Sequence, residues 1–135
     1  MSNWTHVAGI IRLDDLRLDN SLPDFEGIFG KHIGYTDDWD EYYKHPERYL
    51  PCGSEGSLQM DVWINDDKSE ISAYVVAIHG DLRDHDSCDA IIDWFKSKLE
   101  SLWVRQAVIT VRNECNGTKT WTYDRSDCDE NSVYE

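Results

Sequence analysis

Residues 58–79, LQMDVWINDDKSEISAYVVAIH, predict two antiparallel strands joined by a polar turn. The even-numbered positions of residues 58–64 are apolar, and they alternate with Gln59, Asp61 and Trp63. A period of two is typical of a strand with one buried face and one open face. Because Trp63 lies opposite the apolar row, the pattern places it on the open face, and we expect it there beside Tyr74 of the returning strand.

An amphipathic helix is predicted after this hairpin. Asp86 is the expected N-cap, with Asp89 three residues later in the capping-box position. The apolar residues that follow recur at spacings of three, four and seven, which places them on one helix face: Cys88, Ile91, Ile92, Phe95, Leu99, Leu102 and Trp103. Such a helix packs its apolar face against a sheet.

Before the hairpin, residues 3–13 predict a strand that is apolar on both faces and therefore lies inside the sheet. Ser21 is the expected cap of a helix whose apolar residues repeat at helical spacing as far as His32. We expect His6 and His32 to face the core. Residues 35–57 form an aromatic and acidic insertion that begins with a short helix.

Strands at residues 104–112 and 118–123, joined by the two-residue turn Asn116-Gly117, complete the pattern. The order strand, helix, strand, strand, helix, strand predicts a ferredoxin-like split βαβ fold (βαββαβ) of the α+β class. Its antiparallel sheet carries both helices on one face, and the C-terminal hairpin adds a strand. We expect one domain at residues 1–123, followed by an acidic, mobile tail at residues 124–135.

The charge of the chain indicates the kind of partner. It has 27 Asp and Glu against 13 Lys and Arg, a formal net charge of -14, together with six Trp and seven Tyr. The aromatic content predicts a packed core, in contrast to disordered acidic chains. Because carboxylates repel phosphate backbones and anionic membranes, we expect no direct binding of nucleic acid or membrane. A basic surface on another protein is the partner that this charge favours.

The compartment follows from what the sequence lacks. No apolar run is long enough for a membrane-spanning helix, and the first residues have no basic and apolar leader pattern. The cysteines contain no CxxC pair and are expected as reduced thiols in a cytoplasm: Cys52, Cys88, Cys115 and Cys128.

Partner-binding residues are predicted where acids surround aromatic side chains or follow a rigid helix. On the long helix, Asp86, Asp89 and Asp93 form an acidic stripe that imitates the regular charges of a phosphate backbone. The alternative is that these acids only keep the surface soluble and stabilise the helix N-terminus. The complete predicted set is Asp37, Asp38, Trp39, Asp40, Glu41, Trp63, Asp86, Asp89 and Asp93.

A metal site is the second possibility, between the returning strand and the long helix. Two imidazoles and two carboxylates are its candidate ligands: His79, Asp81, Asp84 and His85. Their spacing matches no defined site, and Arg83 lies among them. The glycine-rich stretch 52–57 lacks the lysine of a phosphate loop, and the chain has no GxSxG pattern. We therefore predict no catalytic residue, no cofactor and no enzymatic activity.

Three segments carry a resemblance. They are Ser2 to Arg12 (SNWTHVAGIIR), Gly53 to Leu58 (GSEGSL) and Ile78 to Arg83 (IHGDLR). They resemble small acidic accessory proteins of tailed bacteriophages and prophages. The resemblance implies a bacterial cytoplasm and an action on host machinery, and by analogy it suggests a nucleic-acid mimic that blocks restriction or CRISPR enzymes.

The sequence thus predicts a non-enzymatic acidic protein that inhibits a host nucleic-acid-binding defence protein. Such a protein acts as a monomer or a homodimer. Two alternatives stay open: a metal-binding or small-ligand-binding module built on the residues from His79 to Asp86, and a phage structural protein that assembles into a homo-oligomer through its sheet.

Overall fold

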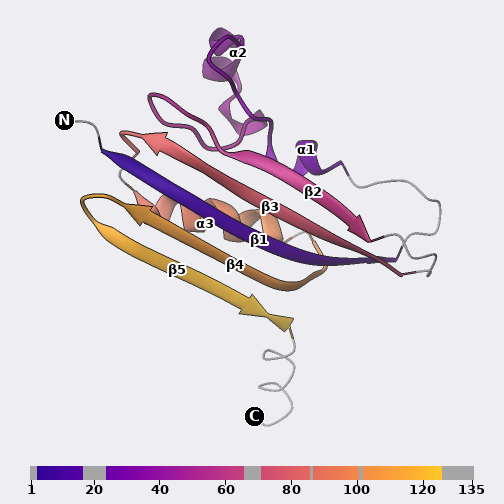
Figure 1. Cartoon of the computed structure of the whole chain (residues 1–135). Helices are drawn as coiled ribbons and strands as arrows, with labels where there is room; N and C mark the ends of the chain where they lie inside the picture. The colour runs from indigo at the N-terminus through magenta and orange to yellow at the C-terminus, as the bar shows by residue number, and fades with distance from the viewer. Residues whose placement is uncertain (1–2, 17–23, 66–70, 86, 101, 126–135) are drawn as a thin grey trace.

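Five antiparallel strands make one sheet in the order β2-β3-β1-β4-β5 (Figure 1). The computed structural model describes residues 3–16, 24–65, 71–85, 87–100 and 102–125. Strand β1 lies between β3 and β4, so the prediction that it is an interior strand is confirmed. The strands are β1 (Trp4–Leu16), β2 (Gln59–Asn65), β3 (Ile71–Arg83), β4 (Val104–Asn113) and β5 (Gly117–Asp124).

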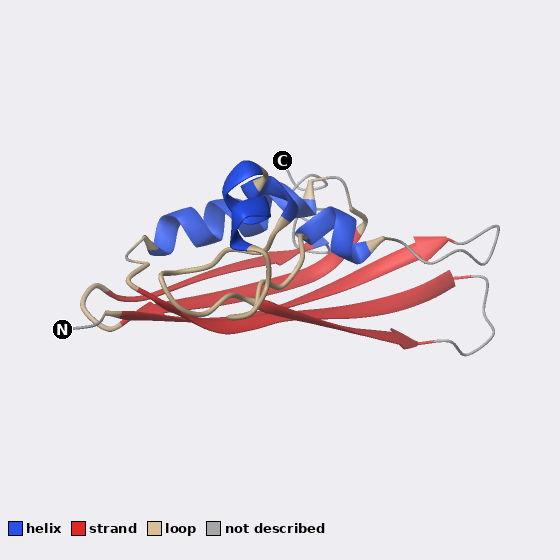
Figure 2. Cartoon of the chain, turned by 90° about the horizontal axis from the view of Figure 1, so that it is seen from above, coloured by secondary structure: helices blue, strands red, loops and turns tan. Residues whose placement is uncertain are grey.

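The helices lie over one face of this sheet (Figure 2). They are α1 (Phe25–Phe29), α2 (Trp39–Lys44), the short 3-10 helix η1 (Pro46–Arg48) and α3 (Cys88–Leu99). No helix in the described part of the chain has the length and apolar content needed to cross a membrane. The opposite side of the sheet is called the open face below.

The core fills the space between α3 and the helix-covered face of the sheet. Alternate residues of β1 point into it, among them Val7 and Ile11, which are buried. Phe95 of α3 is fully buried against Gly9, and a Cβ atom at Gly9 would stand 3.2 Å from Phe95 Cε1. Trp121 of β5 meets the Phe95 ring edge to face, with the ring centroids 6.1 Å apart. The small residue in the central strand therefore makes room for the largest buried side chain of α3.

The predicted α+β class with one antiparallel sheet is confirmed. The strand order differs from that of a four-stranded sheet because β5 extends it, and α1 has only five residues. The ferredoxin-like assignment therefore stays a prediction. Strand β5 ends at Asp124, so the first residue of the predicted tail belongs to the sheet, whereas residues 126–135 lie outside the described part.

The predicted helix boundaries were wrong by a few residues. Helix α1 is capped by Asp24, whose Oδ1 accepts a hydrogen bond from Gly27 N at 3.0 Å. Helix α3 is capped by Ser87, whose Oγ accepts from Ala90 N at 3.1 Å. In α3 a serine hydroxyl therefore caps the helix in place of the expected carboxylate, and in α1 a carboxylate caps it in place of the expected hydroxyl. The predicted caps Ser21 and Asp86 lie outside the described residues.

The helix-face prediction extended too far at its C-terminal end. Helix α3 ends at Leu99, and Trp103 is 66% exposed just before β4. The predicted two-residue turn is also wrong, because Asn113 pairs with Gly117 and leaves three residues in the turn. The Asn113 side chain closes this turn by accepting hydrogen bonds from the backbone of Cys115 and Asn116 at 2.9 Å.

Three side chains face the other way from the prediction. Tyr74 is fully buried against Phe25 of α1, whereas Trp63 lies on the open face opposite Val75. The two aromatic residues are therefore on opposite sides of the sheet. His6 lies on the open face with 44% of its side chain exposed, and His32 is also exposed.

Candidate partner-binding site

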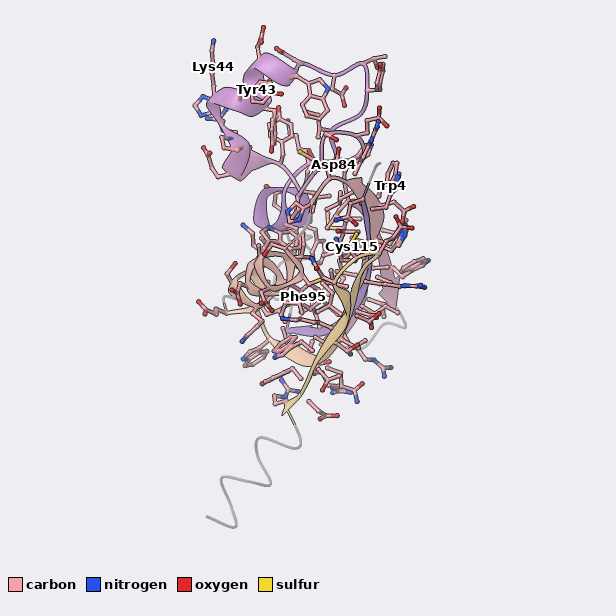
Figure 3. All side chains as sticks on the ribbon, turned by 90° about the vertical axis from the view of Figure 1, so that its left-hand side faces the viewer. Trp4, Tyr43, Lys44, Asp84, Phe95 and Cys115 are labelled. Carbon is pink, nitrogen blue, oxygen red and sulfur yellow. The ribbon has the colours of Figure 1, made fainter. Side chains whose placement is uncertain are left out.

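Residues 31–57, which we call the aromatic insertion, connect α1 to β2 and project beyond the β2 edge of the sheet (Figure 1). Four of their rings pack mainly edge to face, with centroid distances from 5.4 to 6.3 Å: Trp39, Tyr42, Tyr43 and Tyr49. Figure 3 shows Tyr43 and Lys44 on α2, well away from Phe95 in the main core. The insertion therefore has a small aromatic cluster of its own.

Acids of the insertion hold its backbone in place. Asp38 Oδ1 accepts hydrogen bonds from Asp40 N at 3.1 Å and from Glu41 N at 3.2 Å, so it caps α2. Asp37 Oδ2 accepts from Gly34 N, and Trp39 Nε1 donates to the carbonyl oxygen of Gly34 at 3.2 Å. These hydrogen bonds fix the first turn of α2 and the residues just before it, so the carboxylates there have a defined geometry.

The glycine-rich stretch 52–57 fastens the insertion to the sheet. Ser54 N donates to Arg83 O at 2.8 Å, and Arg83 N donates to Glu55 O at 2.9 Å. The Arg83 guanidinium also pairs with the Glu55 carboxylate at 2.8 Å. A Cβ atom at Gly53 would stand 2.2 Å from Arg83 O, so only glycine permits this close approach.

A hydrogen bond joins the aromatic cluster to this stretch. The Tyr42 hydroxyl bonds the Cys52 thiol, and this bond together with burial raises the pKa of Tyr42 to about 12. Burial raises the pKa of the Cys52 thiol as well, although the hydrogen bond from Tyr42 opposes the shift. Both groups are therefore neutral at physiological pH, and the contact is structural.

We expect this bond to be visible in a titration. A difference titration of the wild-type protein against Tyr42→Phe, followed by tyrosinate absorbance, should show Tyr42 ionising near pH 12 instead of at the ordinary 10.0. The folded protein holds this proton more tightly than the unfolded chain. Its contribution to stability is therefore complete below pH 10 and is lost as the pH rises toward 12. In Cys52→Ala the pKa should fall toward 10.0, and an unchanged value would show that the thiol has no part in the shift.

A pocket of about 350 Å³ lies between α2 and the glycine-rich stretch, and it is called the insertion pocket below. Three aromatic residues, Tyr35, Trp39 and Tyr43, supply its rings. The other lining residues are His32, Ile33, Gly34, Gly53, Ser54, Glu55, Gly56 and Ser57. The lining includes a carboxylate and has neither lysine nor arginine.

The charge around this pocket is strongly negative. The aromatic insertion has three Lys and Arg residues, which are Lys31, Lys44 and Arg48. Against these three stand six acids: Asp37, Asp38, Asp40, Glu41, Glu47 and Glu55. Exposed charges of one sign on a rigid surface create a potential that attracts a cationic partner.

The structure brings only part of the predicted binding set together. Asp37, Asp38, Trp39, Asp40 and Glu41 form one group at the start of α2. Trp63 is 57% exposed on the open face, so it belongs to a different surface. Asp89 and Asp93 are exposed on α3, and Asp86 lies outside the described residues. Asp89 also pairs with Lys119 of β5 at 2.8 Å, which weakens the predicted acidic stripe.

The four metal-site candidates do not converge. His79 Nε2 lies 2.9 Å from Asp61 Oδ2, and Asp81 Oδ1 lies 2.6 Å from His6 Nδ1. Asp84 accepts from Asn3 N at 3.2 Å and from Ser54 Oγ at 3.1 Å. The pKa of its carboxyl is lowered, first by the backbone hydrogen bond from Asn3. The backbone oxygen of His85 accepts a hydrogen bond from Thr5 Oγ1. Among the described residues, no group of three His, Cys, Asp or Glu side chains is arranged to hold a metal ion.

The open face carries two histidine–carboxylate pairs that the sequence pattern does not reveal. His6 lies between Asp81 and Glu114, and the hydrogen bond with Asp81 is the main cause that raises the pKa of His6. The other pair, His79 and Asp61, is described above. The pairing follows from strand register, which sets β1 and β2 on either side of β3. Sequence alternation places these residues on a face, but it does not give the partner across the strand.

Comparison with known proteins found no matching protein-family model, no similar curated protein and no similar solved structure.

Proposed function

We propose that the protein is a non-enzymatic, acidic binding protein that docks its aromatic insertion onto a basic surface of another protein. The observation that carries the proposal is the six acids of the aromatic insertion, set against three Lys and Arg residues and fixed on an aromatic cluster of their own. The partner class that fits is a host protein that itself binds nucleic acid, because its basic groove is complementary to such a surface.

The balance of forces favours a protein partner over nucleic acid. The formal net charge of -14 repels a phosphate backbone, whereas a basic groove is attracted. Exposed rings next to the acids add apolar contact area, and Tyr43 is 73% exposed on α2. Aromatic anchors surrounded by charges are typical of the residues that dominate binding energy at protein interfaces.

In this proposal the protein is a phage or prophage accessory factor in a bacterial cytoplasm. It occupies the nucleic-acid groove of a restriction or CRISPR nuclease and so inhibits host defence. The resemblance of Ser2 to Arg12 and of two further segments to phage accessory proteins supports this setting. By analogy, acidic phage proteins of similar size act as mimics of nucleic acid.

We also infer that β1 to β4, with α1 and α3, form a ferredoxin-like unit to which β5 is added. Strand β1 separates the parallel strands β3 and β4, which α3 connects, and the helices share one face. In that arrangement the aromatic insertion extends the first crossover, where it interrupts no strand pairing. A binding insertion on a stable sheet keeps its shape when it meets a partner.

The experiment measures competition with DNA. A panel of purified restriction and CRISPR nucleases is loaded with fluorescent duplex DNA, and release of the DNA is followed by anisotropy as the protein is added. We expect at least one nuclease to release its DNA. We also expect the affinity of the protein for that nuclease to fall steeply as salt rises, because exposed charges are screened.

The double variant Asp40→Asn/Glu41→Gln should weaken this binding about 2- to 30-fold, as expected for two exposed ion pairs of about 0.2–1 kcal/mol each. The matched control is Glu26→Gln/Glu100→Gln, which removes the same charge from exposed sites on α1 and at the end of α3. If both double variants weaken binding equally, net charge acts without a site. If no nuclease in the panel releases its DNA, the proposal is wrong.

A further inference from the structure

We propose that the insertion pocket receives the guanidinium group of an arginine side chain from the partner's basic surface. This inference rests on the proposed function and specifies how the aromatic insertion recognises its partner. The pocket volume of about 350 Å³ is large enough to admit a long side chain, and the pocket lies between the α2 rings and the stretch 53–57.

The rings supply the first part of the chemistry. Tyr35, Trp39 and Tyr43 line the pocket, and the rings of Trp39 and Tyr43 are inclined at 45° with their centroids 6.3 Å apart. The face of an aromatic ring attracts a cation, with Trp the strongest of these residues. A planar guanidinium also stacks on ring faces, which an ammonium group does not.

The polar atoms of the pocket are suited to a donor. His32 Nδ1 lies 3.1 Å from the carbonyl oxygen of Leu58, which only accepts, so Nδ1 carries the proton in this contact. In the neutral ring His32 Nε2 is then an acceptor, and it lies 3.8 Å from where a Cβ atom of Gly34 would stand. Glu55 adds a carboxylate, whose Oε1 already pairs with the Arg83 guanidinium at 2.8 Å and whose oxygens can accept further hydrogen bonds, and Ser54 adds a hydroxyl. Arginine has five N–H donors and no acceptor, which matches this set.

A second pocket that is also lined by aromatic rings differs from the insertion pocket in its charge. A space of about 380 Å³ at the C-terminal end of α3 is also rich in aromatic rings, because Trp103, Trp121 and Tyr123 line it. Its lining includes the bases Lys96 and Arg125, and Lys96 Nζ lies 5.7 Å from the centre of a Trp121 ring. That pocket already has its own cation over an aromatic face. An added guanidinium is therefore expected in the insertion pocket and not there.

The test uses the full-length protein and a capped arginine, N-acetyl-L-arginine methylamide, with the uncharged isostere N-acetyl-L-citrulline methylamide as its matched control. Indole N–H signals in a proton–nitrogen correlation spectrum report both pockets in one titration. We expect capped arginine to shift the Trp39 signal saturably and to leave the Trp121 signal in place. An equal shift of Trp39 by capped citrulline would overturn the assignment of a cation site.

The variant Tyr43→Ala should lower the affinity for capped arginine about 2- to 30-fold, the range of a cation–π contact. Tyr43 is 73% exposed, so its loss should leave the folded sheet intact, and the spectrum of the variant checks this directly. Unchanged affinity for capped arginine in this variant would show that the Tyr43 ring does not contact the guanidinium. Free L-arginine is the remaining probe, because its carboxylate is repelled by the acidic insertion. Tighter binding of free than of capped arginine would identify an amino-acid site in place of a partner side chain.

The outcomes separate this inference from the proposed function. The arginine titrations contain no nuclease, so saturable binding of capped arginine with no nuclease bound would contradict only the proposed partner class. Conversely, a nuclease that binds wild type and Tyr43→Ala equally, under conditions where the variant has lost arginine binding, would overturn the pocket inference and leave the acidic docking surface intact.

Discussion

Replacing Phe95 by alanine is expected to lower the free energy of unfolding by about 3–5 kcal/mol, the largest stability effect we predict for a single side chain. Phe95 is fully buried and stands between Gly9 of the central strand and Trp121 of β5. Neighbouring backbone in a paired sheet cannot move in to fill the space that the ring leaves. The loss therefore combines the lost burial of the ring with the energy of an unfilled cavity.

The measurement is urea unfolding followed by circular dichroism, with Trp103→Ala as the control. Trp103 is also a large aromatic residue, in the connection between α3 and β4, but it is 66% exposed. Its replacement should change stability by no more than about 0.5 kcal/mol, as is usual for a surface substitution. A Phe95→Ala variant that loses no more stability than Trp103→Ala would show that α3 does not close the core.

Periodicity predicted the buried face of α3 because residues three or four positions apart lie on the same side of a helix. Ile91, Phe95 and Leu99 are buried as expected. The same pattern continued through Leu102 and Trp103, yet the helix stops at Leu99. Helix ends depend on caps and on the path of the next strand, and an apolar pattern contains neither.

Strand alternation predicted the strands and the open-face position of Trp63, but it did not fix which face of the returning strand β3 meets the helices. Tyr74 and Val75 are neighbours in β3, so their side chains point to opposite faces of the sheet whichever face is buried. The predicted placement of Tyr74 beside Trp63 needed the pairing across the turn, where Trp63 is opposite Val75. A shift of one residue in register exchanges every side chain between faces, so the prediction of neighbours failed although both strands were correct.

The sequence predicted which residues belong to the candidate site, but not how the site is attached to the sheet. The acids and rings of residues 37–41 were recognisable from the sequence as one group. Their attachment was not, because it depends on Arg83, whose backbone meets Ser54 and Glu55 only after the chain has folded. Contacts between segments about thirty residues apart leave no local signal in either segment.

The substitution Gly53→Ala is expected to detach the aromatic insertion from the sheet and abolish binding to the partner nuclease. The new methyl group would stand 2.2 Å from Arg83 O and 2.7 Å from Arg83 N, which are backbone atoms of a paired strand. The insertion must therefore move, and the hydrogen bonds that Arg83 makes to Ser54 and Glu55 are lost. Such overpacking costs about 1–3 kcal/mol.

The control for Gly53→Ala is Gly117→Ala in the β4–β5 turn. Gly117 has a φ of +89°, and a Cβ atom there would meet nothing within 4 Å. This variant loses about 1–2 kcal/mol through backbone strain alone, so the two substitutions are similar in overall stability. Only Gly53→Ala should accelerate hydrogen exchange at the amides of Ser54 and Arg83 and remove nuclease binding. Equal binding by both variants would mean that the insertion does not need its attachment to the sheet. The rigid geometry on which the acidic docking surface depends would then be unnecessary.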